Sequence, residues 1–181
     1  LARKLADAMD QAQSVGAMLG VAYLDLDGFK PVNDRLGHDA GDRLLVVAAQ
    51  RMVRSLRPQD CVARLGGDEF AILLPKVQSV QECRQLLQQA MQSIASPYQL
   101  GKHRVGVTAS IGYTLFPQDD ADADTLLRHA DQAMYAAKQA GRNRLHEFDT
   151  SQERQSRKVR EQIQRLREAL VRGEFELFRS E

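Results

Sequence analysis

Apolar side chains recur along the chain at helical and strand-like spacings in turn. Between residues 2 and 15 they fall every three or four positions, a spacing that predicts an amphipathic helix. The run over residues 21–24 is continuously apolar and leads into Asp25-Leu26-Asp27, as expected of a buried strand. A second helical stripe follows Gly41, and Pro58 should end it because proline cannot continue a helix.

The second half of the chain continues this alternation. Two predicted strands, 61–65 and 69–74, are joined at Gly66-Gly67, a pair typical of a hairpin turn. The further predicted elements are a helix over 80–94, a strand over 104–116, a helix over 127–137 that Gly141 caps, a short strand over 144–148 and an amphipathic helix beyond residue 150. Because a helix crosses over after most strands, we expect an α/β sandwich with one central sheet flanked by helices.

Composition adds that the chain is globular. Hydrophobic residues make up 43% and charged residues 27%, and the formal net charge is +1, a balance that favours a folded core over disorder. A charge so near zero gives no basic surface for duplex nucleic acid, so we expect no nucleic acid partner. No apolar run approaches the roughly 18 residues that a membrane span needs, and we expect a cytoplasmic domain, whose full-length protein could be membrane-attached through missing N-terminal parts.

Two groups of acids lie where predicted strands end or turn. Asp25-Leu26-Asp27 ends one strand, and Asp68-Glu69 lies in the hairpin turn behind Gly66-Gly67. Carboxylates that converge repel one another unless a cation neutralises them, and hard oxygen ligands suit Mg²⁺ bound together with substrate phosphates. An isolated acidic pair is as readily a solvated turn, but the two glycines let a ligand approach the backbone and favour a site here.

These residues belong to three blocks that resemble the GGDEF family of diguanylate cyclases. Residues 66–70 read GGDEF, the signature that names the family. The other blocks are DLDGFKPVND at 25–34 with Gly37-His38 and Gly41-Asp42, and ADQAMYAAK at 130–138 with GRN at 141–143. One block alone would be weak, but three in order at the expected separations are specific. The resemblance covers residues 1–148 and implies a sheet similar to the palm of nucleotide cyclases and polymerases.

The resemblance implies a metal centre built on the two acidic groups. Asp25 and Asp68 would hold the metal together with the carbonyl oxygen of Leu26. Glu69 would be the second acid beside the metal and would help to ionise the attacking hydroxyl. By the same resemblance we expect two Mg²⁺ or Mn²⁺ ions per active site.

The resemblance also implies a GTP site. Asn33 and Asp42 would read the guanine, and the phosphates would be held by three cations, Lys30, Lys138 and Arg142, of which Lys30 is also placed among the catalytic residues. Lys138 and Arg142 are four residues apart, which predicts that both lie on one helix face. Backbone close to the phosphates is expected at Gly28, Phe29, Gly66 and Gly67. Taken singly, each residue has an ordinary alternative as a turn, an N-cap or a cation near a helix C-terminus.

A further motif, Arg57-Pro58-Gln59-Asp60, fits R-x-x-D and ends shortly before Gly66. In the family this motif is an inhibitory site for the product, cyclic di-GMP. Arg57 could meet a phosphate or the guanine edge, and Asp60 could accept from the guanine amino group. The alternative is a charged turn that closes a helix.

The end of the chain has a different composition. Residues 149–181 are rich in Gln, Arg and Glu, and the segment LREALVRGEFELF at 166–178 resembles the helix and first strand of an EAL phosphodiesterase domain. A D-x-L-T-G-L-x-N-R segment that usually precedes the first helix of the family is missing. We therefore expect a GGDEF domain over 1–148, followed by a linker helix and the beginning of a truncated EAL-like domain over 149–181.

Together these features predict a signalling enzyme that makes a bacterial second messenger. It would condense two GTP molecules into cyclic di-GMP and two pyrophosphates as a transient, symmetric homodimer, with inhibition through Arg57 and Asp60. One alternative is a non-catalytic module that senses GTP and regulates an adjoining EAL phosphodiesterase. A third hypothesis is a receptor that binds only cyclic di-GMP.

Overall fold

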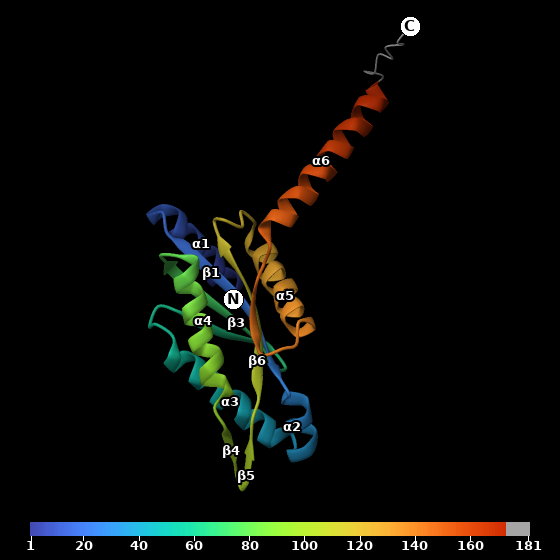
Figure 1. Cartoon of the computed structure of the whole chain (residues 1–181). Helices are drawn as coiled ribbons and strands as arrows, with labels where there is room; N and C mark the ends of the chain where they lie inside the picture. Colours follow the sequence, from blue (N-terminus) through green and yellow to red (C-terminus); the bar gives the residue numbers. More distant parts are fainter. Residues whose placement is uncertain (173–181) are drawn as a thin grey trace. The chain divides into compact units, whose positions relative to one another are not determined.

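A computed structural model describes residues 1–172 and divides the chain into two units (Figure 1). The first unit is Leu1–Phe148, and the second begins at Asp149. The strand expected within residues 166–178 extends beyond the described residues. No helix of the described part is long and apolar enough to cross a membrane.

A five-stranded sheet forms the centre of the first unit, in the order β2-β3-β1-β6-β7. The strands are β1 (Met18–Asp27), β2 (Cys61–Gly66), β3 (Glu69–Val77), β6 (Thr108–Phe116) and β7 (Arg144–Glu147). Central β1 pairs antiparallel with both β3 and β6, whereas β6 pairs parallel with β7. A strand with neighbours on both sides and helices on both faces is mostly buried, which explains the continuous apolar run of β1.

Helices cover both faces of this sheet, which gives the predicted sandwich (Figure 1). They are α1 (Ala2–Val15), α2 (Phe29–Leu36), α3 (His38–Ser55), α4 (Val80–Ala95) and α5 (Ala123–Gln139). Val21 of β1 belongs to the core that α1 and α5 form with the sheet, and Leu24 belongs to the core of α3 and α4. Because side chains alternate along a strand, Asp25 lies on the same face as Val21 and so faces the α5 side.

The predicted strand over 104–116 is wrong at its first residues. Val105 ends a separate short strand, β5 (His103–Val105), which pairs with β4 (Tyr98–Leu100) in a small hairpin of its own. The sheet strand β6 begins only at Thr108. Apolar residues continue through the break, so hydrophobic pattern alone merges two strands that belong to different sheets.

The predicted start of the long helix is also wrong by a few residues. Helix α3 begins at His38, and Gly41 lies inside its first turn, where its N–H bonds the Gly37 carbonyl oxygen at 3.1 Å. A glycine often marks the end of a helix, but Gly41 has a packing role instead. A side chain at position 41 would collide with Asn33 Oδ1.

Close packing also fixes a glycine in the sheet. A side chain at Gly112 of β6 would collide with the backbone of Met134 and Ala130 in α5. Helix α5 therefore lies directly against β6, and this contact determines how close its last turn comes to the ends of β1 and β6.

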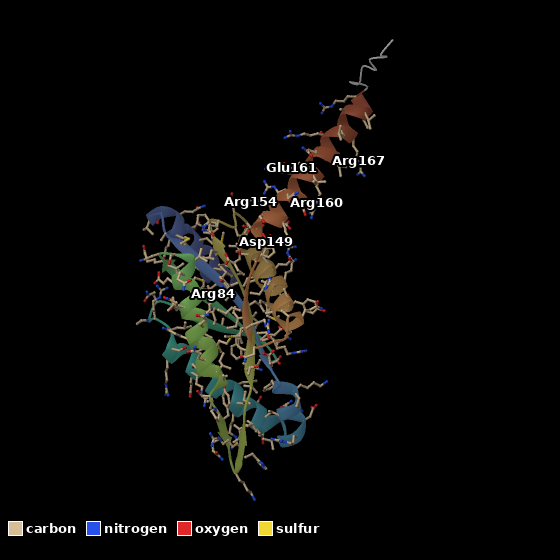
Figure 2. The ribbon with its side chains drawn as sticks, in the orientation of Figure 1. Arg84, Asp149, Arg154, Arg160, Glu161 and Arg167 are labelled. Atoms are coloured by element: carbon tan, nitrogen blue, oxygen red, sulfur yellow. The ribbon has the colours of Figure 1, made fainter. Side chains whose placement is uncertain are left out.

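Up to residue 172, where the described residues end, the second unit contains one helix, α6 (Thr150–Arg172). It has the predicted amphipathic spacing, but no described residue of α6 is buried, and the apolar residues Val159, Ile163, Leu166 and Leu170 are all exposed. Figure 2 labels four of its exposed charged residues, Arg154, Arg160, Glu161 and Arg167.

Candidate functional site

The two acidic groups meet through the backbone of neighbouring strands. Asp25 near the end of β1 is the register partner of Glu69, the first residue of β3. The Leu26 N–H donates to the Asp68 carbonyl oxygen at 3.2 Å, which ties the GGDEF turn to the end of β1. Asp25 and Glu69, which are 44 residues apart in sequence, are thus neighbours, as expected from their positions at strand ends.

Asp25 is the most confined of these acids, with a relative exposure of 8%. Burial raises the pKa of its carboxyl, and the charges of Asp68 and Glu69 raise it further, while a bond from Lys138 opposes both effects. Lys138 Nζ lies 2.8 Å from Asp25 Oδ2. Negative charge is therefore concentrated around Asp25 and is partly neutralised by a cation from α5.

Glu69 is oriented by a tyrosine that sequence reasoning did not single out. The Tyr23 hydroxyl donates to Glu69 Oε2 at 2.9 Å. Burial raises the pKa of Tyr23 well above its ordinary value, and the bond to Glu69 adds to the effect. The nearby Asp131 also has a raised pKa, through burial first and the charge of Glu69 second. Tyr23 therefore stays a neutral donor that directs one Glu69 oxygen.

The donor set suits a hard divalent cation in its chemistry. Carboxylates of Asp25, Asp68 and Glu69, together with the Leu26 carbonyl oxygen, are all oxygen ligands of the kind that Mg²⁺ prefers. Within residues 1–172, however, no three acidic, histidine or cysteine side chains converge as a ready-made metal cluster. Lys138 instead holds one of the oxygens that a metal would take.

The two candidate guanine readers lie at the junction of α2 and α3. Asn33 Oδ1 reaches the backbone at Gly41, one residue before Asp42, and Asn33 Nδ2 lies 3.1 Å from His38 Nδ1. Asp42 is exposed on the surface of α3. The absence of a side chain at Gly41 therefore allows Asn33 of α2 to pack against the first turn of α3, one residue before Asp42.

The start of α2 presents the candidate phosphate contacts of the first block. Gly28 is the N-cap of α2 with φ 81° and ψ 9°, a left-handed conformation that glycine adopts without strain. The helix then begins at Phe29, and Lys30 follows with an exposed side chain. Backbone N–H groups in the first turn of a helix lack intrahelical partners, so they suit an anion.

The expectation that Lys138 and Arg142 share a helix face is wrong. Helix α5 ends at Gln139, and Arg142 lies beyond it with φ 63°. The Arg142 N–H returns to the Ala137 carbonyl oxygen at 3.0 Å, which closes the helix end as a turn. Spacing of four residues places side chains together only where the helix continues, and Gly141 stops it here.

Asp27 organises the loop that carries Arg142. Its carboxylate accepts from Thr108 Oγ1 at 2.9 Å, from Ser110 Oγ at 2.8 Å and from the Asn143 N–H at 3.1 Å. These partners are 81, 83 and 116 residues away, so no local sequence signal could have revealed them. Asp27 is thus bound to the sheet and the loop after α5, while Asp25 faces the other acids.

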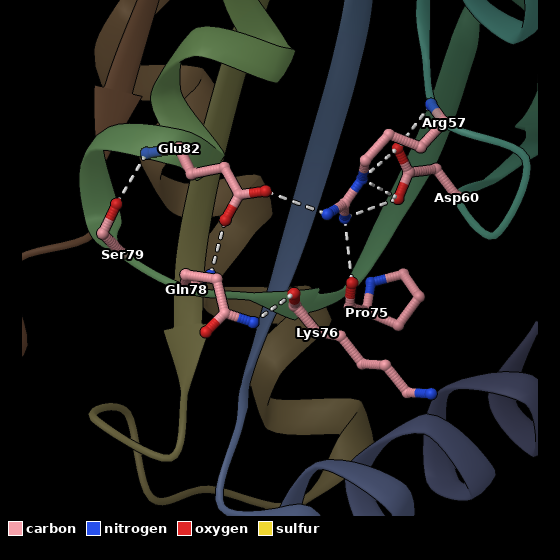
Figure 3. A network of polar contacts seen from close by, with 7 residues as sticks. All are labelled: Arg57, Asp60, Pro75, Lys76, Gln78, Ser79 and Glu82. Carbon is pink, nitrogen blue, oxygen red and sulfur yellow. Dashed lines mark hydrogen bonds and ion pairs between the residues drawn. The ribbon is translucent and has the colours of Figure 1, made fainter.

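The R-x-x-D motif forms a compact network at the far end of β2 from the GGDEF turn (Figure 3). Arg57 Nη2 lies 2.8 Å from Asp60 Oδ1 and also donates to the Pro75 carbonyl oxygen at 2.8 Å. A third acceptor, Glu82 Oε1, lies 3.1 Å from Arg57 Nη1. The hydrogen bonds that Arg57 donates to the Asp60 carboxylate raise the pKa of Arg57 still further, so this guanidinium is a permanent cation.

Asp60 lies beneath Arg57 rather than open to a ligand. Its side chain is fully buried, and its oxygens also accept the Arg57 backbone N–H at 2.8 Å. The geometry of a charged turn, which the sequence left as an alternative, is therefore present. Asp60 could accept a hydrogen bond from a guanine amino group only if Arg57 moved.

Comparison with known proteins defines the class. The family model for the diguanylate cyclase GGDEF domain matches residues 1–144. The palm-like sandwich, the GGDEF turn beside Asp25 and this match leave a single assignment: the chain belongs to the GGDEF family, whose diguanylate cyclases are nucleotidyltransferases.

Three relatives illustrate the likeness. The chain is 38% identical over 174 residues, or 96% of its length, to the bifunctional diguanylate cyclase/cyclic di-GMP phosphodiesterase MucR of Pseudomonas aeruginosa, and spans 25% of it. The solved GGDEF domain of TpbB from the same species has a TM-score of 0.79 at 38% identity, covering 86% of this chain and 91% of that one. The GGDEF domain of DgcB from Caulobacter crescentus, solved with cyclic di-GMP, has a TM-score of 0.72 at 28% identity, covering 80% and 86%.

Proposed function

We propose that residues 1–148 form a diguanylate cyclase that condenses two GTP molecules into cyclic di-GMP. The observation that supports this most is the pairing of the GGDEF turn with the end of β1. The Leu26 N–H donates to the Asp68 carbonyl oxygen, and Glu69 lies opposite Asp25 in the register of the strands. In each of two steps a 3′-hydroxyl attacks an α-phosphorus, a new P–O bond forms, and the bond to pyrophosphate breaks. The balance is two GTP in, and one cyclic di-GMP and two pyrophosphates out.

Diguanylate cyclases generally use a divalent metal, which lowers the pKa of a bound hydroxyl and stabilises charge on the phosphates. In this chain Asp25, Asp68 and the Leu26 carbonyl would hold it, and we propose two Mg²⁺ or Mn²⁺ ions. Glu69, directed by Tyr23, would accept the proton of the attacking hydroxyl. The closeness of the GGDEF turn to Asp25 supports this assignment, because carboxylates that converge favour a bound cation.

Lys138 would change partners when GTP binds. Its ammonium now neutralises Asp25 at 2.8 Å, and a metal at Asp25 would release it for the triphosphate. Lys30 at the start of α2 and Arg142 after α5 would hold the other phosphate oxygens. The Asp27 bond to the Asn143 N–H supports this role, because it fixes the backbone beside Arg142.

Guanine would be read at the α2–α3 junction. The Asp42 carboxylate can accept from the N1–H and amino groups of guanine, and the Asn33 amide can contact its ring edge. Adenine lacks that pair of donors, so a site built on them would reject ATP. The phosphates would lie close to the backbone at four residues, Gly28, Phe29, Gly66 and Gly67.

The proposed reaction needs two chains. The site residues provide one nucleotide pocket per chain, while the product joins two nucleotides related by two-fold symmetry. Two pockets must therefore face one another in a transient homodimer.

Product inhibition is proposed for the Arg57 network. The strand β2 separates it from the GGDEF turn by roughly 17 Å at about 3.3 Å per residue, so a ligand there would not touch the reacting atoms. A guanidinium held in one geometry suits a phosphate or the guanine O6/N7 edge.

The activity of the whole protein is a separate proposal. The chain spans 25% of the length of MucR, and MucR is named for both synthesis and hydrolysis of cyclic di-GMP. We propose that residues 149–181 lead into an EAL-like domain. If so, a module that only senses GTP and regulates that domain is the second candidate function.

Incubation of the purified chain with GTP and Mg²⁺, followed by chromatography for cyclic di-GMP and pyrophosphate, separates the candidates. Two pyrophosphates per cyclic di-GMP are expected, and ATP should give neither. GTP binding by calorimetry without product would instead favour the sensing module. Binding of cyclic di-GMP alone would favour a receptor.

A further inference from the structure

The Arg57 network contains an acid that the R-x-x-D motif does not include. Glu82 belongs to the first turn of α4, 25 residues from Arg57 in sequence, and Figure 3 shows its carboxylate directed at the guanidinium. Its Oε1 lies 3.1 Å from Arg57 Nη1, while Asp60 occupies Nε and Nη2. The Pro75 carbonyl oxygen also takes Nη2. Glu82 thus holds the Nη1 side of a cation whose other side is already bonded.

The capping of α4 holds Glu82 in place. The Ser79 side chain caps α4 by accepting the Glu82 N–H at 3.0 Å, and Glu82 Oε2 accepts the Gln78 N–H at 2.6 Å. This arrangement resembles a capping box, except that the returning bond comes from the residue before the N-cap, Gln78, and not from Ser79 itself. Oε2 of Glu82 therefore stabilises the start of α4, and Oε1 forms the ion pair with Arg57.

The exposure of the three side chains shows which of them a ligand for Arg57 would meet. The Asp60 side chain is fully buried, whereas the side chains of Arg57 and Glu82 are 22% and 33% exposed. An anion that reaches Arg57 from solvent must arrive where Glu82 already binds. Among these three side chains the two carboxylates outnumber the guanidinium, so they oppose the anionic ligand that Arg57 would attract.

We propose that Glu82 sets the affinity of the R-x-x-D site for cyclic di-GMP by competing with the ligand's phosphate for Arg57. Binding then exchanges the Glu82–Arg57 ion pair for a phosphate–Arg57 pair. Asp60 remains in place beneath the guanidinium and keeps it oriented. This inference rests on the proposed product site, and it adds a residue that lowers the sensitivity of that site to product.

Glu82→Gln is the informative variant because the glutamine amide oxygen can still accept the Gln78 N–H, while the negative charge is removed. Calorimetry with cyclic di-GMP should give a Kd roughly fivefold lower than for the parent chain, the size expected for a partly exposed ion pair. The gain should shrink as salt is raised, since screening weakens both the repulsion and the competing pair. The initial rate with GTP should be unchanged, whereas inhibition by added product should begin at lower concentration.

Two companion variants separate the possible failures. Ser79→Ala loosens the same helix start without altering charge at Arg57, so it should leave the Kd near that of the parent. Arg57→Ala, alone and combined with Glu82→Gln, should remove the binding.

If Arg57→Ala leaves the Kd unchanged, cyclic di-GMP binds elsewhere and the proposed product site is wrong. If Arg57→Ala abolishes binding but Glu82→Gln binds no more tightly than the parent, the role of Glu82 alone is overturned. A Ser79→Ala gain equal to that of Glu82→Gln would likewise assign the effect to the helix start. Absence of binding in both the parent and Glu82→Gln would contradict both proposals.

Discussion

Asp25 and Lys138 show how single residues in this site depend on one another. Asp25 is buried next to two other acids, and Lys138 from α5 offsets their charge at 2.8 Å. An ion pair of this kind opposes the rise in the pKa of Asp25, a role that another cation could take over from the ammonium. The acids and the lysine are therefore expected to affect different steps, chemistry and GTP binding respectively.

Asp68→Asn should lower kcat by roughly a hundredfold or more, a size typical for loss of one group that stabilises charge in the transition state. KM for GTP should change far less, because the lost interaction is made mainly in the transition state. Steady-state kinetics with Mg²⁺ measure both constants. Asp120→Asn, which removes an exposed acid before α5, is the matched control. Turnover of Asp68→Asn near that of the control would refute the metal assignment.

Lys138→Met should instead act mainly on GTP binding. Methionine keeps most of the length of the side chain and removes the ammonium, so the triphosphate loses a charge-assisted contact worth about 1.5–3 kcal/mol. We expect KM to rise at least tenfold, while Lys102→Met in the turn between β4 and β5 leaves it unchanged. A normal KM with only kcat reduced would show that Lys138 serves Asp25 and not the substrate.

The sequence predicted residues whose partners follow from a motif, and missed those whose partners come from folding. Asp25, Asp68 and Glu69 are visible because acids at strand ends and a glycine pair stand close together in the chain. Tyr23 looks like an ordinary strand residue, and Asp27 is visible as an acid beside Asp25 but its partners are not. Their bonds reach partners 46 to 116 residues away, which only the register of β1 against β3 and β6 brings near.

At the scale of elements, the position of α5 on the sheet connects packing with the site. Gly112 lets α5 lie against β6, and the same helix carries Lys138 to Asp25. Hydrophobic spacing predicted the helix but not this contact. The prediction of a single strand over 104–116 was wrong for a related reason. The hydrophobic pattern does not show that β5 pairs with β4 and not with the central sheet.

Gly112→Ala should destabilise the fold by about 1–3 kcal/mol, the usual cost of forcing an added methyl into a packed interior. Position 106 provides the control, because an added Cβ there meets no atom within 4 Å, and Gly106→Ala should stay within about 0.5 kcal/mol of the parent. Urea unfolding followed by circular dichroism measures both. Equal stability of the two variants would contradict the packing of α5 on β6.

At the scale of the whole molecule, residues 1–172 comprise a compact first unit and the helix α6, none of whose described residues is buried. The sequence predicted the boundary from a change in composition. It could not show which partner covers the exposed apolar stripe of α6, because an amphipathic pattern specifies a face and not its contact.

A chain ending after Asp149 should therefore keep the stability of the first unit. Loss of α6 removes no buried side chain of its own, so the unfolding free energy should change by less than about 0.5 kcal/mol. Thermal and urea unfolding of both chains provide the comparison. A loss of several kcal/mol would show that the first unit needs residues beyond 149 to fold.

The central claim is that two chains meet to join two GTP molecules, and one titration tests it most directly. Specific activity for cyclic di-GMP is measured at saturating GTP and Mg²⁺ across a wide range of enzyme concentration, while sedimentation reports the oligomeric state. Because the dimer population grows with the square of the monomer concentration, specific activity should rise with concentration from a largely monomeric chain. Constant specific activity from a demonstrable monomer would contradict the face-to-face reaction.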